Sequence, residues 1–326
     1  MVQSDRLCKV YRVKEKKGLF KPASIKEVVA AKDLSLTIEP GHIVGLLGVN
    51  GAGKTTTIRM LAGILEPTSG TFTIDGIDGV KHPREIKKKV NVITGGERNI
   101  YWRLTARENL EYFGALYGVP KALLKERIAA LIDLVGLDDS ADVPVEKYSK
   151  GMKQRLQIAR GLINDPQYLF LDEPTLGLDI AIAKELRAYV RDLAKEHERG
   201  ILLTTHYITE VEELCDTVYL INEGRVIKTG SPRELIQLAQ MGVGVRVHVD
   251  ALPAAAEGSI QALAARYDAS VETAQDEQGV SILIHGTENL STHCMKLLTD
   301  EGLLVKKLEI TEPKMEDALM KLTMEG

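Results

Sequence analysis

The segment Gly48–Thr56, GVNGAGKTT, has the residue types and spacing of a loop that holds phosphate groups. It matches Gly-x-x-x-x-Gly-Lys-Thr, with Gly48, Gly53, Lys54 and Thr55 at the fixed positions. In such loops backbone N–H groups surround phosphate oxygens, the lysine reaches the β- and γ-phosphates, and the threonine hydroxyl ligates Mg²⁺. The nucleotide-binding residues predicted here are Gly48, Asn50, Gly51, Ala52, Gly53, Lys54, Thr55 and Thr56.

The flanking sequence supplies the elements that this loop needs. The apolar run Ile43–Leu47 predicts a buried strand before it, and the apolar spacing in Thr57–Leu61 predicts a helix after it. A strand–loop–helix context is what the motif requires. We therefore expect the loop to bind a nucleotide rather than to be a glycine-rich turn without function.

Two adjacent carboxylates, Asp172 and Glu173, follow the apolar run Tyr168–Leu171. In open α/β sheets ligands bind at the carboxyl ends of the strands, so both acids are predicted to face the nucleotide. Asp172 is expected to hold Mg²⁺ through water, and Glu173 to orient or deprotonate the attacking water. Taken alone, the pair could also be a strand-end turn that only makes hydrogen bonds.

Composition and length limit the class of protein. At 326 residues the chain exceeds one typical domain, and its net charge of −4 disfavours a nucleic-acid binder. The three cysteines form no Cys-x-x-Cys pair, which favours a reducing compartment and no metal framework. There is no secretory signal and no apolar run long enough to cross a bilayer. A cytoplasmic chain is expected, and any membrane part would come from another subunit.

The order of patterns predicts two domains. Residues 1–38 read as two strands, Leu7–Tyr11 and Lys32–Ile38, around a basic loop from Lys14 to Lys26. Ile43–Gly230 alternates strands with helices, as in a mainly parallel sheet. Residues 98–165 read as a helical subdomain, with a capping box at Thr105-x-x-Glu108. We expect a first domain over 1–238.

Residues 242–326 are predicted to form a smaller α+β domain. Alternating apolar residues and helical faces follow one another in the order β-α-β-β-α-β, which is typical of a ferredoxin-like module, and a last helix follows Pro313. The histidines of this region are dispersed, so no catalytic or metal site is expected in it.

A third motif, Tyr148–Gln154, opens a predicted helix upstream of Asp172. Together with the loop at Gly48 and the acids at Asp172, it resembles the signature of the ATP-binding cassette (ABC) ATPases, over roughly residues 1–235. The resemblance implies an α/β P-loop NTPase core with an antiparallel N-terminal part and a helical subdomain. It also implies that Ser149 and Gly151 face the ATP held by a second subunit, so that the working unit is a dimer.

The same resemblance implies three further roles. Asp179 resembles the residue of the family's dimer-interface loop, and His206 the histidine that contacts the γ-phosphate and steadies the hydrolytic water. Tyr11 resembles the aromatic residue that stacks on adenine. A simpler interpretation of Ser149 is a helix N-cap, and the two roles are compatible.

The chain also departs from the family pattern. A glutamine that usually follows the strand Val90–Thr94 is absent, and Glu97 is the candidate substitute as a Mg²⁺ or water contact. In the signature, Tyr148, Lys150 and Met152 replace the residues usual in the family. Such variant signatures with a C-terminal extension look like the branch of bacterial and archaeal exporters of drugs, sodium or surface polymers.

The expected function is thus ATP hydrolysis, with Mg²⁺, in a homodimer or in a dimer with a related ATPase subunit. This dimer is expected to drive an integral-membrane permease and to attach to the inner face of the membrane through it. Ile100–Trp102 is a candidate docking surface, although burial in the core would also explain it. The alternative is a soluble mechanoenzyme of the same family that acts on nucleic acid or ribosomes. The single cassette and the lack of a long coiled coil disfavour that alternative.

Overall fold

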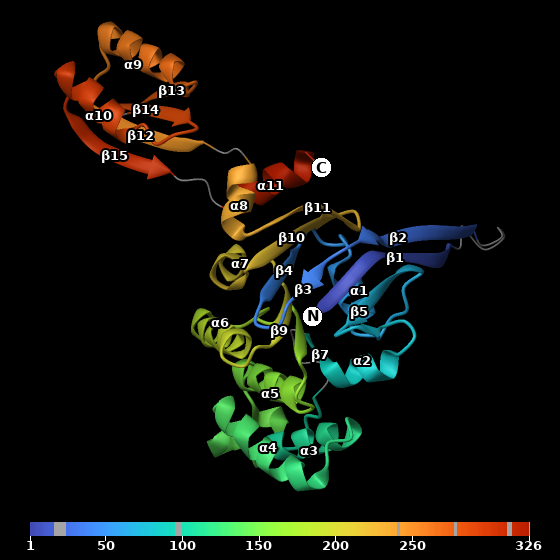
Figure 1. Cartoon of the computed structure of the whole chain (residues 1–326). Coiled ribbons are helices and arrows are strands. Elements are labelled where there is room, and N and C mark those ends of the chain that lie inside the picture. Colours follow the sequence, from blue (N-terminus) through green and yellow to red (C-terminus); the bar gives the residue numbers. More distant parts are fainter. Residues whose placement is uncertain (16–23, 95–99, 240–241, 277–278, 312–314, 326) are drawn as a thin grey trace. The chain divides into compact units, whose positions relative to one another are not determined.

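The computed structural model describes residues 1–15, 24–94, 100–239, 242–276, 279–311 and 315–325 (Figure 1). Contacts within the chain group residues 1–232 into one compact unit and residues 233–325 into a second. Helix α8, Pro232–Leu238, therefore groups with the second unit from Arg233 onward, whereas the sequence predicted a first domain that extends to residue 238. Each unit has its own apolar core.

A six-stranded sheet forms the centre of the first unit, in the order β11-β10-β4-β9-β8-β7. All neighbours are parallel except β10 and β11, so the predicted mainly parallel sheet is confirmed. β4, β8 and β9 are almost wholly buried apolar runs, as strands covered on both faces must be. The strands are β4 (Ile43–Leu47), β7 (Val90–Thr94), β8 (Tyr168–Asp172), β9 (Gly200–Thr204), β10 (Thr217–Asn222) and β11 (Arg225–Gly230).

A second, antiparallel sheet carries the N-terminal part of the chain, as predicted. β1 is longer than the sequence suggested, because it pairs with β5 and β3 near its start and with β2 along the rest of its length. The predicted single strand Lys32–Ile38 is wrong: the chain leaves β2 after Leu34 and re-forms a strand at Thr37. The strands are β1 (Val2–Glu15), β2 (Ser24–Leu34), β3 (Thr37–Ile38), β5 (Ser69–Ile74) and β6 (Ile77–Asp78).

Ser4 explains this break. Its hydroxyl accepts a hydrogen bond from Leu36 N–H at 2.9 Å, and Ser4 N–H donates to Leu36 O at 2.9 Å. Leu36 is thereby fixed between β2 and β3, with its side chain buried. The Ser4 hydroxyl takes the place of a backbone carbonyl as the partner of Leu36 N–H, so the regular strand ladder is interrupted at Leu36.

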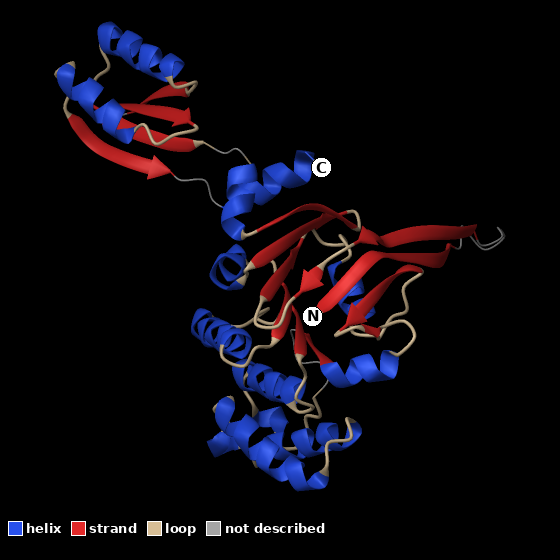
Figure 2. Cartoon of the chain, in the orientation of Figure 1, coloured by secondary structure: helices blue, strands red, loops and turns tan. Residues whose placement is uncertain are grey.

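The helices of the first unit cover the parallel sheet, and α3 and α4 pack together as a helical part that is green in Figure 1 (Figure 2). The predicted capping box is confirmed, since Thr105 and Glu108 bond reciprocally at the start of α3. α5 contacts both α3 and α4, and joins them to strand β7. The helices are α1 (Lys54–Leu61), α2 (Pro83–Lys89), α3 (Ala106–Leu116), α4 (Lys121–Leu134), α5 (Lys150–Leu162), α6 (Ile180–Lys195) and α7 (Ile208–Leu214), with two short 3₁₀ turns, Asp138–Ser140 and Val145–Lys147.

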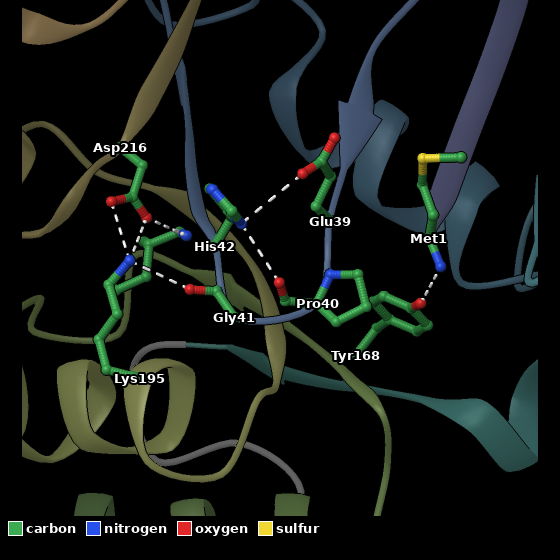
Figure 3. A network of polar contacts seen from close by, with 9 residues as sticks. Met1, Glu39, Pro40, Gly41, His42, Tyr168, Lys195 and Asp216 are labelled. Carbon is green, nitrogen blue, oxygen red and sulfur yellow. Dashed lines mark hydrogen bonds and ion pairs between the residues drawn. The ribbon is translucent and has the colours of Figure 1, made fainter.

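The amino ends of the parallel strands are held by polar contacts, several of which Figure 3 shows. Lys195 Nζ contacts both Asp216 oxygens at 2.9 Å and Gly41 O at 3.1 Å, and Asp216 also accepts from Ile43 N–H at 2.8 Å. Tyr168, at the start of β8, is bonded there by the Met1 amino group. These contacts fix the end of the sheet opposite to Asp172.

Asp75 completes this cluster. It accepts hydrogen bonds from Lys89 Nζ at 2.7 Å and from Tyr168 Oη at 2.6 Å. Burial alone would raise the pKa of Asp75, but the bonds from Lys89, the Met1 amino group and Tyr168 hold that pKa well below its usual range. Burial, together with the neighbouring Asp75 carboxylate, raises the pKa of Tyr168, which therefore stays a donor.

Asp75→Asn is expected to lower the melting temperature by about 2–4 °C near pH 7, because charge-assisted hydrogen bonds are lost. The carboxylate's pKa is depressed in the folded state, so its stabilisation is present above the unfolded value of about 3.9 and fades as the pH falls below it. The difference in melting temperature between wild type and variant should therefore be smaller at pH 3.5 than at pH 7. Calorimetry at the two pH values measures it. Asp5→Asn, in an exposed ion pair with Arg6, is the control; an equal effect there would contradict this role.

The second unit contains a four-stranded antiparallel sheet in the order β13-β14-β12-β15. Its element order β-α-β-β-α-β and this strand order are those of the ferredoxin-like module predicted from the sequence. Figure 2 shows α9 and α10 on one face of the sheet, where their apolar residues meet those of β12 and β14. The elements are β12 (Val243–Val249), α9 (Ala254–Arg266), β13 (Ser270–Asp276), β14 (Gly279–Gly286), α10 (Ser291–Asp300), β15 (Val305–Thr311) and the final helix α11 (Met315–Glu325).

Across the described part of the chain, none of the helices has the length and apolar content that a bilayer span requires.

Candidate functional site

The loop Gly48–Thr56 joins the central strand β4 to α1 and folds around its own lysine. Lys54 Nζ donates to the carbonyl oxygens of Gly48 and Val49 at 2.6 and 3.2 Å, and Ala52 N–H donates to Val49 O at 3.1 Å. α1 begins at Lys54 without a side-chain cap, and the first N–H groups of a helix have no intrahelical partner. The loop therefore offers backbone donors and one ammonium group, a combination that suits a polyphosphate.

Gly53 shows why this loop needs glycine. Its φ is 107°, which side chains rarely adopt, and a Cβ there would lie 2.1 Å from Ala30 O on β2. The close approach also places the β1–β2 hairpin beside the loop. Tyr11, the predicted adenine-stacking residue, lies on this hairpin, paired with Val28 and half-buried, with Lys9 Nζ 5.7 Å from its ring centroid.

Three side chains meet where the neighbouring strands β8 and β9 end. Asp172 is paired in register with Thr204, whose hydroxyl donates to Asp172 Oδ1 at 2.6 Å. The hydroxyl of Thr55, from the loop, donates to Asp172 Oδ2 at 3.0 Å. The structure thus brings together the two residues predicted as Mg²⁺ ligands, Thr55 and Asp172, although they are 117 positions apart.

Glu173 and His206 are in direct contact. His206 Nε2 lies 2.6 Å from Glu173 Oε1, and neither side chain is more than 39% exposed. Glu173 has a positive φ of 54°, a backbone conformation that costs a non-glycine residue about 1 kcal/mol or more. Its N–H donates to Thr204 O at 3.0 Å, which holds that conformation and aims the carboxylate at His206.

The charges of the site converge on the lysine. Burial lowers the pKa of Lys54, while the nearby carboxylates of Glu173 and Asp172 oppose that shift. Burial disfavours the charged form of an amine, and a nearby negative charge favours it. The arrangement therefore favours binding of a further anion next to Lys54.

A second group of predicted residues lies at two helix starts. Ser149 caps α5, its hydroxyl accepting from Met152 N–H at 3.2 Å, so the predicted N-cap is confirmed. Asp179 caps α6, with Oδ1 accepting from Ile182 N–H at 2.9 Å. A Cβ on Gly151 would lie 2.3 Å from Ile182 Cδ1, so this glycine allows the two helix starts to approach closely.

Comparison with known proteins places this arrangement in a family. Residues 31–176 match the family model described as ABC transporter. The chain is 47% identical to the ABC transporter ATP-binding protein NatA of Bacillus subtilis (strain 168), over 65% of this chain and 86% of that protein. The chain belongs to the ATP-binding subunits of ABC transporters. It is therefore an ATPase, and its hydrolysis of ATP is coupled to transport.

Two further similarities agree. The Nod factor export ATP-binding protein I of Ralstonia nicotianae (strain ATCC BAA-1114 / GMI1000) is 40% identical over 82% of this chain and 84% of that protein. A solved structure of the ATP-binding subunit of an ABC transporter superposes with a TM-score of 0.60 and 27% identity, covering 73% of this chain and 92% of that one. These similarities favour the transport function over the predicted alternative, a mechanoenzyme acting on nucleic acid or ribosomes.

The sequence did not predict some residues of the site, and one predicted residue lies outside the described part of the chain. Thr204 was not predicted as a site residue, because its place beside Asp172 depends on strand register, which single-sequence patterns do not give. The contact between Thr175 and Glu210, described below, was missed for a similar reason. Glu97, the candidate substitute for the family's glutamine, lies outside the described residues and stays a prediction.

Proposed function

We propose that this chain is the ATPase subunit of an exporter, and that two copies bind two ATP molecules between them. Each ATP would lie on the Gly48–Thr56 loop of one copy and be completed by Ser149 and Gly151 of the other. The observation that carries the proposal is the convergence of four side chains at the carboxyl ends of β8 and β9. They are Thr55, Asp172, Glu173 and His206.

The residues present fit Mg²⁺ with a triphosphate. Thr55 and Asp172 place a hydroxyl and a carboxylate oxygen together, which are ligands that Mg²⁺ accepts. Among the described residues no group of three or more acids, histidines or cysteines could hold a metal ion by itself. Mg²⁺ commonly keeps several waters and binds phosphate oxygens besides one or two protein ligands. When bound, the ion would neutralise phosphate charge. Lys54 would then bind the phosphates in place of its present contacts with loop carbonyls.

Glu173 and His206 are proposed to act on the hydrolytic water. Glu173 would accept a proton from that water, and His206, already in contact with the carboxylate, would fix its direction. Asp172 is bound by two hydroxyls and takes no part in proton transfer in this proposal.

The second subunit is proposed to contribute the start of α5. Ser149 is exposed, so its hydroxyl and the start of α5 are open to phosphate oxygens of the other copy. Gly151 is proposed to contribute its backbone N–H, since its missing side chain makes room for Ile182 within the chain. Asp179, at the start of the adjacent α6, would lie at the same interface. We propose a homodimer because one chain carries both halves of the site. Residues 242–326 are proposed to act as a separate accessory domain.

Export, rather than uptake, is proposed from the relatives. The Ralstonia protein is named for Nod factor export, and it covers most of this chain. The partner would be an integral-membrane permease that holds the ATPase at the inner face of the cell membrane. Purification of the chain from solubilised membranes should then recover a permease with it; recovery with ribosomes or nucleic acid alone would contradict the proposal.

An exposed aromatic cluster on the helical part is the proposed docking surface for the permease. Tyr101 and Trp102 are each 47% exposed, so the alternative interpretation of burial in the core is wrong for this pair, whereas it is right for Ile100, which is 8% exposed. Tyr101 Oη donates to Tyr112 Oη at 3.2 Å, and Lys153 Nζ lies 4.4 Å from the centroid of the Trp102 ring. Partly exposed aromatic residues are enriched at protein interfaces.

Trp102 is the only tryptophan of the chain, so subtracting the spectrum of the complex formed with the Trp102→Phe chain removes any tryptophan emission of the permease and leaves that of this surface. We expect its emission to move to shorter wavelength when the purified permease binds, because the ring leaves water. Trp102→Phe should remove the signal without preventing purification of the folded ATPase. An unchanged spectrum in a complex shown to be intact by gel filtration would exclude Trp102 from the interface.

A further inference from the structure

A buried carboxylate joins two loops of the catalytic site. Glu210 lies in the first turn of α7 and is 1% exposed. Its Oε1 accepts a hydrogen bond from the hydroxyl of Thr175, which is 3% exposed, and its Oε2 has no hydrogen-bond partner among the described residues. A carboxylate taken out of water is costly unless it is well paired, so the place of Glu210 needs a reason.

Thr175 belongs to the loop that carries the proposed catalytic and interface acids. The loop runs from Glu173 to Asp179, and it is bent by hydrogen bonds from Leu176 N–H to Glu173 O and from Leu178 N–H to Thr175 O, at 3.2 and 3.0 Å. The hydroxyl of Thr175 points out of this loop and donates to Glu210 on α7. A displacement of the loop at Asp179 is therefore resisted at Thr175.

Glu210 belongs to the segment that carries His206. α7 begins at Ile208, and Glu210 N–H donates to Tyr207 O at 3.1 Å, so His206 and Glu210 lie on one short, bonded segment. That segment meets the loop at two places. One is the contact of His206 with Glu173, and the other is the bond of Glu210 with Thr175.

Arg187 of α6 completes the connection. Its Nη1 lies 4.0 Å from Glu210 Oε1, and its Nε donates to Glu213 Oε2 at 2.7 Å. The Arg187 side chain is 15% exposed, so the charge of Glu210 is offset largely out of water. α6 is the helix that Asp179 caps. Glu210 thus contacts the Glu173–Asp179 loop through Thr175 and the following helix α6 through Arg187.

We propose that Glu210 is a positioning residue, which through Thr175 fixes the Glu173–Asp179 loop against the segment of His206. The inference rests on the proposed roles of Glu173, His206 and Asp179. A change at the dimer interface near Asp179 is transmitted through Thr175 and Glu210 to the contact between His206 and Glu173. The chain thereby couples the approach of the second subunit to the geometry of hydrolysis.

Thr175→Val is the decisive variant, because it keeps the shape of the side chain and removes only the hydroxyl. We expect kcat for ATP to fall by about tenfold or more, since small misplacements of catalytic groups are expensive, while KM stays close to that of wild type. The melting temperature should fall by a few degrees, because the buried Glu210 loses its hydrogen-bond donor, so kcat is measured well below the melting temperature of the variant. Thr175→Ser, which restores the hydroxyl, should recover most of the rate. Glu212→Gln, an exposed glutamate on the same helix, is the matched control.

Glu210→Gln tests the partner. If the two residues act through one bond, adding Glu210→Gln to Thr175→Val should lower kcat by less than about twofold, because coupled substitutions are not additive. A kcat for Thr175→Val within threefold of wild type, or a loss of ATP binding as large as the loss of kcat, would overturn the proposal. So would failure of Thr175→Ser to recover the rate.

The proposed function is tested apart from this link. ATP-dependent dimer formation by Glu173→Gln tests whether two copies bind ATP between them. This dimer formation does not require the Thr175 hydroxyl. If Glu173→Gln dimerises and Thr175→Val turns over normally, only the inference about Glu210 fails. If Glu173→Gln stays monomeric with ATP, the proposed dimer itself fails.

Discussion

Replacing Glu173 by glutamine is expected to lower the steady-state rate of ATP hydrolysis by about 10²–10⁴-fold, the usual contribution of a general base. The amide has the size of the carboxylate and can still contact His206, which lies 2.6 Å from Oε1 in the wild type. It cannot accept the proton of the attacking water at neutral pH. ATP binding should persist, because neither Lys54 nor Thr55 is altered.

The variant should therefore accumulate as a closed dimer with ATP. Gel filtration with ATP and Mg²⁺ would show a shift to twice the monomer mass, and a phosphate-release assay would show the lost turnover. Glu198→Gln, an exposed glutamate after α6, should behave as wild type in both assays. Normal turnover by Glu173→Gln would remove Glu173 from the proposed role.

Replacing Lys54 by alanine is expected to weaken ATP binding by about 10²-fold or more, because a largely buried charged partner of the phosphates disappears. The wild-type Lys54 ammonium donates to Gly48 O at 2.6 Å and to Val49 O at 3.2 Å, so it also braces the loop. Both effects act in the same direction. Binding of a fluorescent ATP analogue measures the first, and the melting temperature without nucleotide measures the second.

Lys88→Ala provides the comparison for Lys54→Ala. Lys88 is an exposed lysine on α2, so its removal changes the net charge equally without touching the loop. Its ATP affinity should match that of wild type. Tight ATP binding by Lys54→Ala, at the wild-type dissociation constant, would contradict the assignment of the loop.

The parts of the site that the sequence revealed are those that depend on neighbouring residues. The Gly48–Thr56 loop is a local motif, and its strand and helix follow from local apolar spacing. The cap at Ser149 and the capping box at Thr105 are equally local, and the structure confirms both. The parallel sheet also followed, because alternating strands and helices leave few other arrangements.

The parts that were missed depend on residues far apart in the chain. Thr204 reaches Asp172 only because β8 and β9 are aligned in one particular register. The bond between Thr175 and Glu210 requires α7 to pack against the Glu173–Asp179 loop, and no periodicity in either segment encodes that contact. The break after Leu34 was missed because it depends on Ser4, thirty-two residues from Leu36.

The order of strands in the parallel sheet has a consequence for synthesis on the ribosome. β4 is flanked by β9 and β10, whose residues Gly200–Thr204 and Thr217–Asn222 come more than 150 positions later. Long-range pairing of this kind delays folding. The nascent chain must thus hold β4 unpaired until about two-thirds of its length has been translated, exposing an apolar segment to chaperones or to aggregation. The nucleotide loop at the end of β4 can become competent only after that point.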